Sequence, residues 1–135
     1  MRSRVKMFAS GLLFLCYLLV FFDLQITGAA DCERAKTTRD IVNCEKAHFN
    51  DAVQSLGNLR NQINGVLNDR ERKALDAAQS AWLTYREKHC AAAALLYEGG
   101  TMESVMMTSC MAGLTEQRVR DLHAIFDPWL RSRKK

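Results

Sequence analysis

The sequence predicts an all-α protein: a small up-down-up three-helix bundle, stapled by two disulfides, that follows an N-terminal signal peptide. Three observations support this prediction. The chain is rich in Ala, Leu, Arg, Glu and Gln and has a single proline, a composition that favours helices. Apolar residues recur every three or four positions, as on the buried face of a helix. Four cysteines follow the export signal, which indicates disulfide bonds.

Residues 1–30 have the organisation of a secretory signal peptide. Basic residues precede an apolar stretch, residues 7–22, that is shorter than the ~20 residues usually needed to span a bilayer. Cleavage is expected after Ala30, with cleavage after Ala29 as a close alternative. An uncleaved membrane anchor is the other interpretation. We expect a periplasmic or secreted protein, with no stable membrane insertion once the signal is removed.

The remainder of the chain is long enough for one domain, residues 31–130, followed by a basic tail, residues 131–135. The domain has a slight excess of acidic over basic side chains, and the tail holds four cationic residues. Because no basic stripe runs along a folded face, nucleic acid is not an expected partner.

Cys32, Cys44, Cys90 and Cys110 should form two disulfides in an exported domain of this size. Of the three possible pairings, geometry favours Cys32–Cys44 with Cys90–Cys110. The second pair lies almost symmetrically about a Gly-Gly pair at 99–100, so the two cysteines would face each other across a helical hairpin. Each closed loop would stabilise the fold by about 3 kcal/mol.

Metal binding is the rival explanation for the cysteines. No C-x-x-C motif occurs, and His48, His89 and His123 show no ligand spacing with the cysteines. We therefore expect neither a metal site nor a cofactor. No paired carboxylates, Ser-His-Asp set or phosphate-binding loop emerges, so the protein is not expected to be an enzyme.

Helices are expected at residues 38–67, 70–97 and 102–126. Thr37 or Thr38 should cap the first helix, Asp69 the second and Thr101 the third. The glycines of the first helix allow a bend or an early end, and the Asp-Pro pair at 127–128 should stop the third. The residues expected on the buried faces are Ile41, Phe49, Val53, Leu56, Ile63 and Leu67 in the first helix, Leu75, Gln79, Trp82, Arg86 and Cys90 in the second, and Val105, Ala112, Val119, Leu122 and Phe126 in the third.

The second half of the chain carries a specific motif. It combines LDAAQSAWLTYREKHC, YEGGT and, after another cysteine, LTEQRVRDL. This pattern resembles the LprI-like lysozyme-inhibitor family of small exported bacterial domains. The residues at the family's motif positions that we expect to be structural are Leu75, Gln79, Trp82, Tyr85, Arg86, Thr115, Arg118 and Leu122.

The first half of the chain follows the family less closely. The leader from Cys32 to Cys44 matches, and Ala52 and Leu56 keep apolar positions. Three polar positions differ. Val53, Gly57 and Arg60 stand where the family usually has Asp, Asn and Tyr.

The resemblance implies a helical exported domain and, for some members, binding and inhibition of lysozyme. We therefore expect a protein-binding domain with lysozyme as the leading partner, and we expect it to act by steric occlusion of the enzyme. We expect a monomer. A disulfide-tethered, exposed turn is the candidate contact site, although its first explanation is a simple helix connection. The residues of this candidate site are Tyr97, Glu98, Gly99, Gly100, Thr101 and Glu103.

Two other functions remain open. The protein could be a periplasmic immunity or envelope-stress protein that neutralises another toxin. It could also be a metal carrier, because thioethers bind copper(I). The four methionines concerned are better explained as adaptable core residues. They are Met102, Met106, Met107 and Met111.

A binding face formed by Gln79, Trp82 and Arg86 is a further alternative. The structural explanation is stronger, because buried polar groups must be hydrogen-bonded. We expect Trp82 to pack into the bundle, with Gln79 and Arg86 bonded to loop carbonyls or carboxylates around it.

Overall fold

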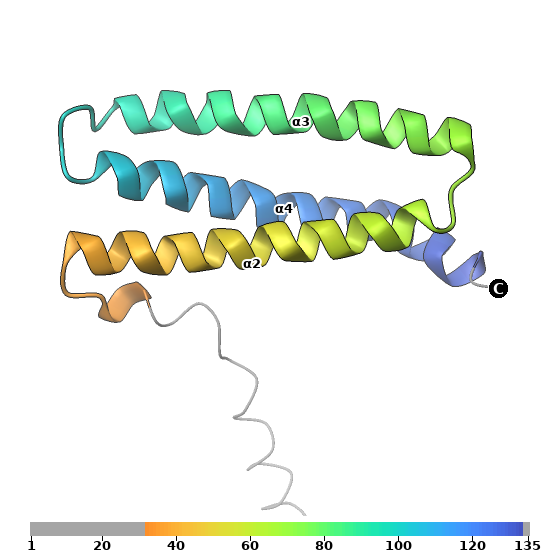
Figure 1. The fold of residues 1–135 in the computed structure, drawn as a ribbon, viewed down its shortest axis with the longest axis horizontal. Helices are drawn as coiled ribbons and strands as arrows, with labels where there is room; N and C mark the ends of the chain where they lie inside the picture. Colours follow the sequence, from red (N-terminus) through yellow and green to blue (C-terminus); the bar gives the residue numbers. More distant parts are fainter. Residues whose placement is uncertain (1–31, 134–135) are drawn as a thin grey trace, which may run out of the picture. The chain divides into compact units, whose positions relative to one another are not determined.

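The structure, a computed structural model, describes residues 32–133. A short 3-10 helix, η2 (Cys32–Arg34), precedes three α-helices: α2 (Thr38–Asn64), α3 (Asp69–Leu95) and α4 (Glu103–Ser132). The α-helices run up, down and up with short connections (Figure 1). Within the described residues there is no strand, so the predicted all-α three-helix architecture is confirmed. The predicted signal peptide lies outside the described residues.

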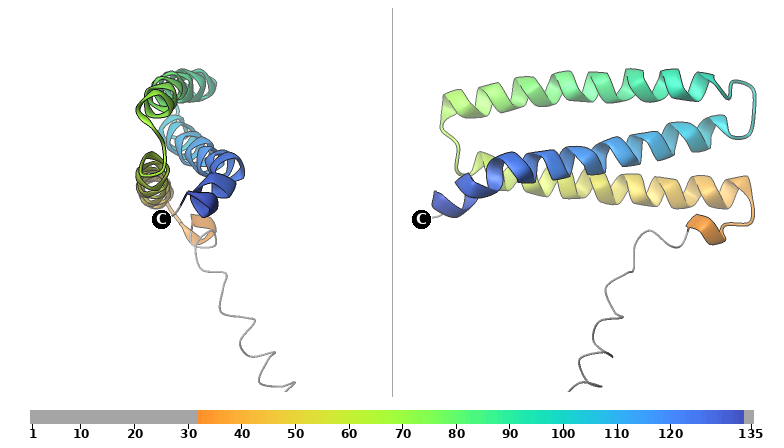
Figure 2. Two further views of the ribbon diagram at one scale, coloured as in Figure 1. Left: turned by 90° about the vertical axis from the view of Figure 1, so that its right-hand side faces the viewer. Right: turned by 180° about the vertical axis from the view of Figure 1, so that it is seen from behind.

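The α-helices belong to one compact unit that begins at Ala35, and α4 is its central element. α4 packs along both α2 and α3. Figure 2 shows the three helices end-on in its left view and from behind in its right view. None of the helices within residues 32–133 is long and apolar enough to cross a membrane.

Local signals determine where α2 begins and ends. The Thr37 side chain accepts a hydrogen bond from the Asp40 amide at 3.1 Å, which satisfies one of the unpaired N–H groups of the first turn. The helix stops at Asn64, three residues before the predicted end. Gly65 is the C-cap, and its N–H donates to the Asn61 carbonyl at 3.1 Å.

The caps of the other two helices differ from the prediction. Asn68, rather than Asp69, caps α3 and forms a capping box with Glu71, in which each side chain accepts from the other's backbone N–H. Met102 occupies the N-cap position of α4 without a side-chain cap bond, so Thr101 is not the cap. The pattern located these boundaries to within a residue or two, but not the capping group.

The prediction that the third helix stops at 127–128 is wrong. α4 continues through Pro128 to Ser132. Proline removes one backbone donor from a helix, but tertiary contacts beyond it hold the last turn in place. Leu130 packs against the core, and Arg133 donates to the Val66 carbonyl at 3.2 Å. The predicted basic tail therefore begins inside α4.

The interior differs between the two ends of the bundle. Large apolar side chains gather toward the α2–α3 connection, whereas the buried residues near the α3–α4 turn are mostly small. The first cluster consists of Leu56, Leu59, Ile63, Leu75 and Leu122, with Leu67, Trp82, Val119, Phe126 and Leu130 packed against it. The second group consists of Ala52, Cys90, Ala94, Val105 and Ala112.

Most of the predicted buried faces are confirmed, with one error in α2. Val53 is 43% exposed, whereas its neighbour Ala52 is buried. Leu59, which the prediction left out, is also buried. The face of α2 toward α4 is thus centred one residue away from the predicted stripe in this part of the helix.

Candidate functional site

Both predicted disulfides are present. Cys90 and Cys110 join α3 to α4, with their Cα atoms 5.6 Å apart. Cys90 has no exposed surface, so the bond belongs to the packed interface between the two helices. This bond tethers the two helices close to the turn that connects them.

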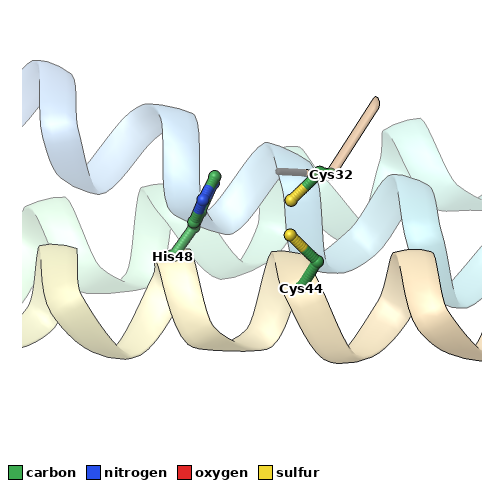
Figure 3. Close-up of side chains that lie close together, drawn as sticks. All are labelled: Cys32, Cys44 and His48. Atoms are coloured by element: carbon green, nitrogen blue, oxygen red, sulfur yellow. The ribbon is translucent and has the colours of Figure 1, made fainter. Parts of the chain in front are cut away.

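Cys32 and Cys44 are also disulfide-bonded. Figure 3 shows their sulfur atoms facing each other, with His48 one turn further along α2. The sulfur atoms and a ring nitrogen of His48 lie within 4.8 Å of one another. The sequence analysis found no ligand spacing between His48 and the cysteines. His48 lies four residues after Cys44, however, and this i, i+4 spacing on α2 places the two side chains next to each other. The disulfide leaves these sulfurs without the thiolate form that binds metal.

The turn from Tyr97 to Glu103 is held by a dense set of hydrogen bonds. The Gly100 amide donates to the Tyr97 carbonyl at 2.9 Å, and the Gly99 amide donates to Glu103 Oε2 at 3.2 Å. Gly99 has a φ of +73°, a conformation that is readily adopted only by residues without a Cβ. At Gly100, an added Cβ would lie 3.1 Å from the Tyr97 carbonyl oxygen. Gly99 is therefore required by the backbone conformation of the turn, and a side chain at Gly100 would force the Tyr97 carbonyl to shift.

Large apolar side chains surround this turn and face solvent. Leu96 is 83% exposed, Leu95 60%, Tyr97 41% and Met102 39%. The predicted contact residues lie here, all exposed except the half-buried Glu103. The sequence analysis missed Leu95 and Leu96, and it interpreted Met102 as a core residue, whereas Met102 is exposed. The sequence signal for Leu95 and Leu96 was the apolar run that continues past the alanines at 91–94 to the end of α3, where these side chains no longer pack in the bundle.

A shallow pocket of about 580 Å³ lies beside the turn, between the end of α3 and the start of α4. Its charged group is Glu103, while Glu98 is exposed nearby on the turn. The C-terminal end of α3 adds the negative end of its helix dipole. This tip of the molecule is therefore apolar with a mildly acidic character. The pocket is lined by Ala91, Ala94, Leu95, Gly100, Thr101, Glu103, Ser104 and Met107.

The motif residues on α3 and α4 come together in the interior rather than at this tip. Gln79 and Arg86 are buried on α3, and Thr115 is fully buried on α4. Arg118 Nε donates to Gln79 Oε1 at 3.5 Å, and the Arg118 guanidinium lies 5.8 Å from the Trp82 ring centroid. The motif thus connects the two helices by polar side chains packed around one indole ring.

Arg86 lies at the centre of this network. Its Nη1 donates to Thr115 Oγ1 at 3.0 Å, and the Thr115 hydroxyl donates to the Met111 carbonyl at 2.6 Å. The guanidinium also lies 5.2 Å from the Phe49 ring centroid on α2 and 5.1 Å from that of Trp82. Burial lowers the pKa of Arg86, but an arginine remains protonated in proteins.

The partners of these polar groups are not those predicted. Loop carbonyls or carboxylates were expected around Gln79 and Arg86. The structure instead shows an arginine and a threonine of α4 as their partners. The expectation failed because Thr115 lies 29 positions after Arg86, and Arg118 lies 39 positions after Gln79. These residues come close to their partners only after the hairpin has folded.

Other candidate residues lie outside the motif network. Tyr85 is half exposed, and its hydroxyl oxygen lies 3.4 Å from His89 Nδ1 on the next turn of α3. Met106, Met107 and Met111 are partly buried on α4. These side chains add nothing to the motif network.

Two of the three positions at which α2 departs from the family pattern are exposed, and the third, Arg60, is partly buried. Gly57 is exposed, and a Cβ placed there would meet no atom within 4 Å. Arg60 forms an ion pair with Asp76 of α3, with an N–O distance of 2.8 Å. This ion pair links α2 to α3, a pair of helices that is otherwise connected mainly through α4.

Comparisons with known proteins identify relatives of this chain. An uncharacterized protein of Rhizobium meliloti, R02472, is 33% identical over 99 residues, which is 73% of this chain and 65% of that protein. The chain therefore spans slightly less than two thirds of the length of this relative. No solved structure matches. The family described as Lysozyme inhibitor LprI matches residues 29–122, from the first disulfide to the end of the α3–α4 motif, and the chain belongs to this family.

Proposed function

We propose that this protein is an exported inhibitor that binds lysozyme through the Gly99-Gly100 turn and blocks the enzyme by steric occlusion. The exposed apolar cluster at the turn carries this proposal. Leu95, Leu96 and Tyr97 present large apolar surfaces to solvent, although they are connected to a well-packed bundle. Contiguous exposed apolar groups of this kind are typical of protein-contact sites.

The rigidity of the turn is suited to occlusion. The Cys90–Cys110 bond and the hydrogen bonds of Gly99 and Gly100 already order it before a partner arrives. A pre-ordered surface avoids a cost of about 0.5–1.5 kcal/mol for each side chain that would otherwise be immobilised on binding. The mechanism requires no covalent step, in keeping with membership of an inhibitor family rather than an enzyme family.

A cell-wall turbidity assay tests the proposal. Protein expressed from the full-length sequence and recovered from the envelope is titrated against lysozymes of several types. We expect saturable inhibition, and we expect the variant Leu96→Asp to weaken it by about tenfold or more, since it places a charge in the centre of an apolar contact. Val53→Asp is the matched control, because Val53 is an exposed apolar residue of α2 that is remote from the turn along the chain.

Two outcomes would contradict the proposal. If no lysozyme type is inhibited at a micromolar excess of protein, lysozyme is not the target. If Leu96→Asp and Val53→Asp inhibit as well as the unmodified protein does, the contact surface lies elsewhere. Circular dichroism of each variant is the control that tests whether the fold is retained.

A further inference from the structure

A second apolar surface lies toward the other end of the bundle, in a groove between the first half of α3 and the second half of α4. The groove has a volume of about 530 Å³, within the range of about 300–1,000 Å³ that is usual for small-molecule sites. Ile125 and Trp129 form part of its wall and remain 59% and 49% exposed. Ala74 and Ala78 leave room along the α3 side.

The groove is elongated along α4. Its lining on α4 extends from Arg118 to Arg133, which are separated by about 22 Å at the helical rise of 1.5 Å per residue. Phe126 and Leu122 lie between them on the same face. A single extended hydrocarbon chain fits this shape better than a compact ligand does.

The charges of the groove are unequal at its two ends. Arg133 is paired with Glu71, with an N–O distance of 2.9 Å, and it also lies over the Trp129 ring with its guanidinium carbon 4.7 Å from the ring centroid. Arg118 has no carboxylate partner among residues 32–133. Its one hydrogen bond to a protein group, from Nε to Gln79, leaves both terminal amino groups for another acceptor. The groove therefore has an apolar floor and one unneutralised cation.

A second copy of the chain would be a poor occupant. A two-fold axis near Ile125 would bring the apolar faces of two α4 helices together in antiparallel orientation. Arg118 of one copy would then lie opposite the region of Arg131 and Arg133 in the other. The carboxylate of that region, Glu71, is already paired with Arg133, so a second copy would leave Arg118 unneutralised within the interface.

We propose that this groove binds a single-chain anionic amphiphile, with the alkyl chain against Leu122, Phe126 and Trp129 and the carboxylate or phosphate head group at Arg118. An arginine presents a planar pair of donors that suits either head group. The apolar walls shield the chain from water, and binding is therefore expected to strengthen with chain length. This site is separate from the Gly99-Gly100 turn and does not depend on lysozyme binding.

Isothermal titration calorimetry of the protein expressed from the full-length sequence tests this proposal, with all ligands kept below their micelle concentrations. Dodecanoate should bind saturably and more tightly than octanoate. It should also bind about tenfold more tightly than dodecyltrimethylammonium, which has the same chain and the opposite charge. Arg118→Gln should abolish this preference for the anion, whereas Arg120→Gln should retain it. Arg120 is a suitable control because it is exposed and is bonded to Gln117.

A second pair of variants tests the groove without changing charge. Ala78→Trp fills the groove and should abolish binding, whereas Ala77→Trp, on the neighbouring exposed position outside the groove, should not. Equal binding of dodecanoate by these two variants would overturn the proposal, as would equal affinity of the unmodified protein for the anionic and cationic amphiphiles. Binding of an acidic amphipathic peptide but not of dodecanoate would also overturn it and would identify a helix-docking groove instead.

Discussion

Arg86 shows how a single residue can determine the arrangement of all three helices. A buried guanidinium without a carboxylate is costly, because several kcal/mol of hydration are lost. Here the faces of Phe49 and Trp82 and the hydroxyl of Thr115 surround it, each from a different position along the chain. A cation–π contact contributes up to about 2 kcal/mol when it is desolvated. The charge thus favours the one packing in which all three groups meet.

The bond between Thr115 and Arg86 leads to a first prediction. Thr115→Val should lower the free energy of unfolding by about 1.5–3 kcal/mol, because a buried charged donor loses its acceptor. In an Arg86→Met background the same change should cost much less, since no donor remains to be satisfied. Urea denaturation of the four proteins measures the coupling.

Thr108→Val is the control for this cycle. The Thr108 hydroxyl also donates to the carbonyl four residues earlier, at 2.8 Å, but it accepts no bond from a charged group. If Thr115→Val and Thr108→Val lowered the free energy of unfolding equally, the charge of Arg86 would play no part in the stabilisation.

At the scale of secondary-structure elements, the α3–α4 hairpin depends on a turn whose backbone tolerates few side chains. Gly99 is the only described residue with a positive φ, and Glu103 accepts a bond from its amide. The disulfide and the motif network then join the same two helices further along. The hairpin therefore contains its own covalent and polar connections, whereas α2 depends on its contacts with α4.

A pair of glycine variants tests the conformation of the turn. Gly99→Ala should destabilise the protein by about 1–2 kcal/mol, the cost of a left-handed conformation for a residue with a Cβ. Gly113→Ala should instead stabilise it by about 0.5–1 kcal/mol, because Gly113 is inside α4 and an added Cβ would meet no atom within 4 Å. Thermal unfolding of the two variants gives the comparison, and a loss of stability in both would contradict the interpretation.

At the scale of the whole molecule, the two ends of the bundle are stabilised by different means. Large apolar side chains pack around Ile63 and Leu122 at one end, while the Cys90–Cys110 disulfide joins α3 to α4 and small side chains pack at the other. The same division separates the two candidate binding surfaces. The apolar groove lies in the part stabilised by packing, and the exposed turn lies in the part stabilised by cross-links.

Reduction of the disulfides should therefore affect the two ends unequally. Each loop is expected to contribute about 3 kcal/mol on the chain-entropy model. After reduction, amides near the turn, in residues 91–109, should lose hydrogen-exchange protection earlier than those of residues 56–63 and 119–126. Exchange followed by mass spectrometry measures this order, and uniform loss of protection along the chain would contradict it.

We expect the ion pair between Glu71 and Arg133, near the α2–α3 connection, to depend on pH. Hydrogen bonds from Arg133 and from the Asn68 amide lower the pKa of Glu71 below 4.5. A carboxyl group with a lowered pKa stabilises the folded state above the unfolded-state pKa, and this contribution is lost as the pH falls through the folded-state pKa. Glu71→Gln should therefore reduce the fall in stability between neutral pH and the acid range below 4.5. Urea titrations at each pH measure this difference, and an unchanged fall in Glu71→Gln would contradict it.

Much of this architecture was predictable from local patterns. The spacing of apolar residues placed three helices, and the near-symmetry of Cys90 and Cys110 about the glycine pair predicted the hairpin disulfide. Helix ends were predicted less well. Pro128 has a strong local tendency to end a helix, but the packing of Leu130 and the bonds of Arg133 outweigh it.

The sequence by itself determined the helical class, the pairing of the cysteines and the family, because each depends on residue types at short, regular spacings. Only the tertiary structure decided what the motif residues contact, and which apolar side chains remain exposed. Thr115 meets Arg86, and Leu95 and Leu96 are left outside the bundle, because these outcomes depend on how helices pack after the turns have formed. Packing between distant segments has no local signal, and both candidate surfaces arise from it.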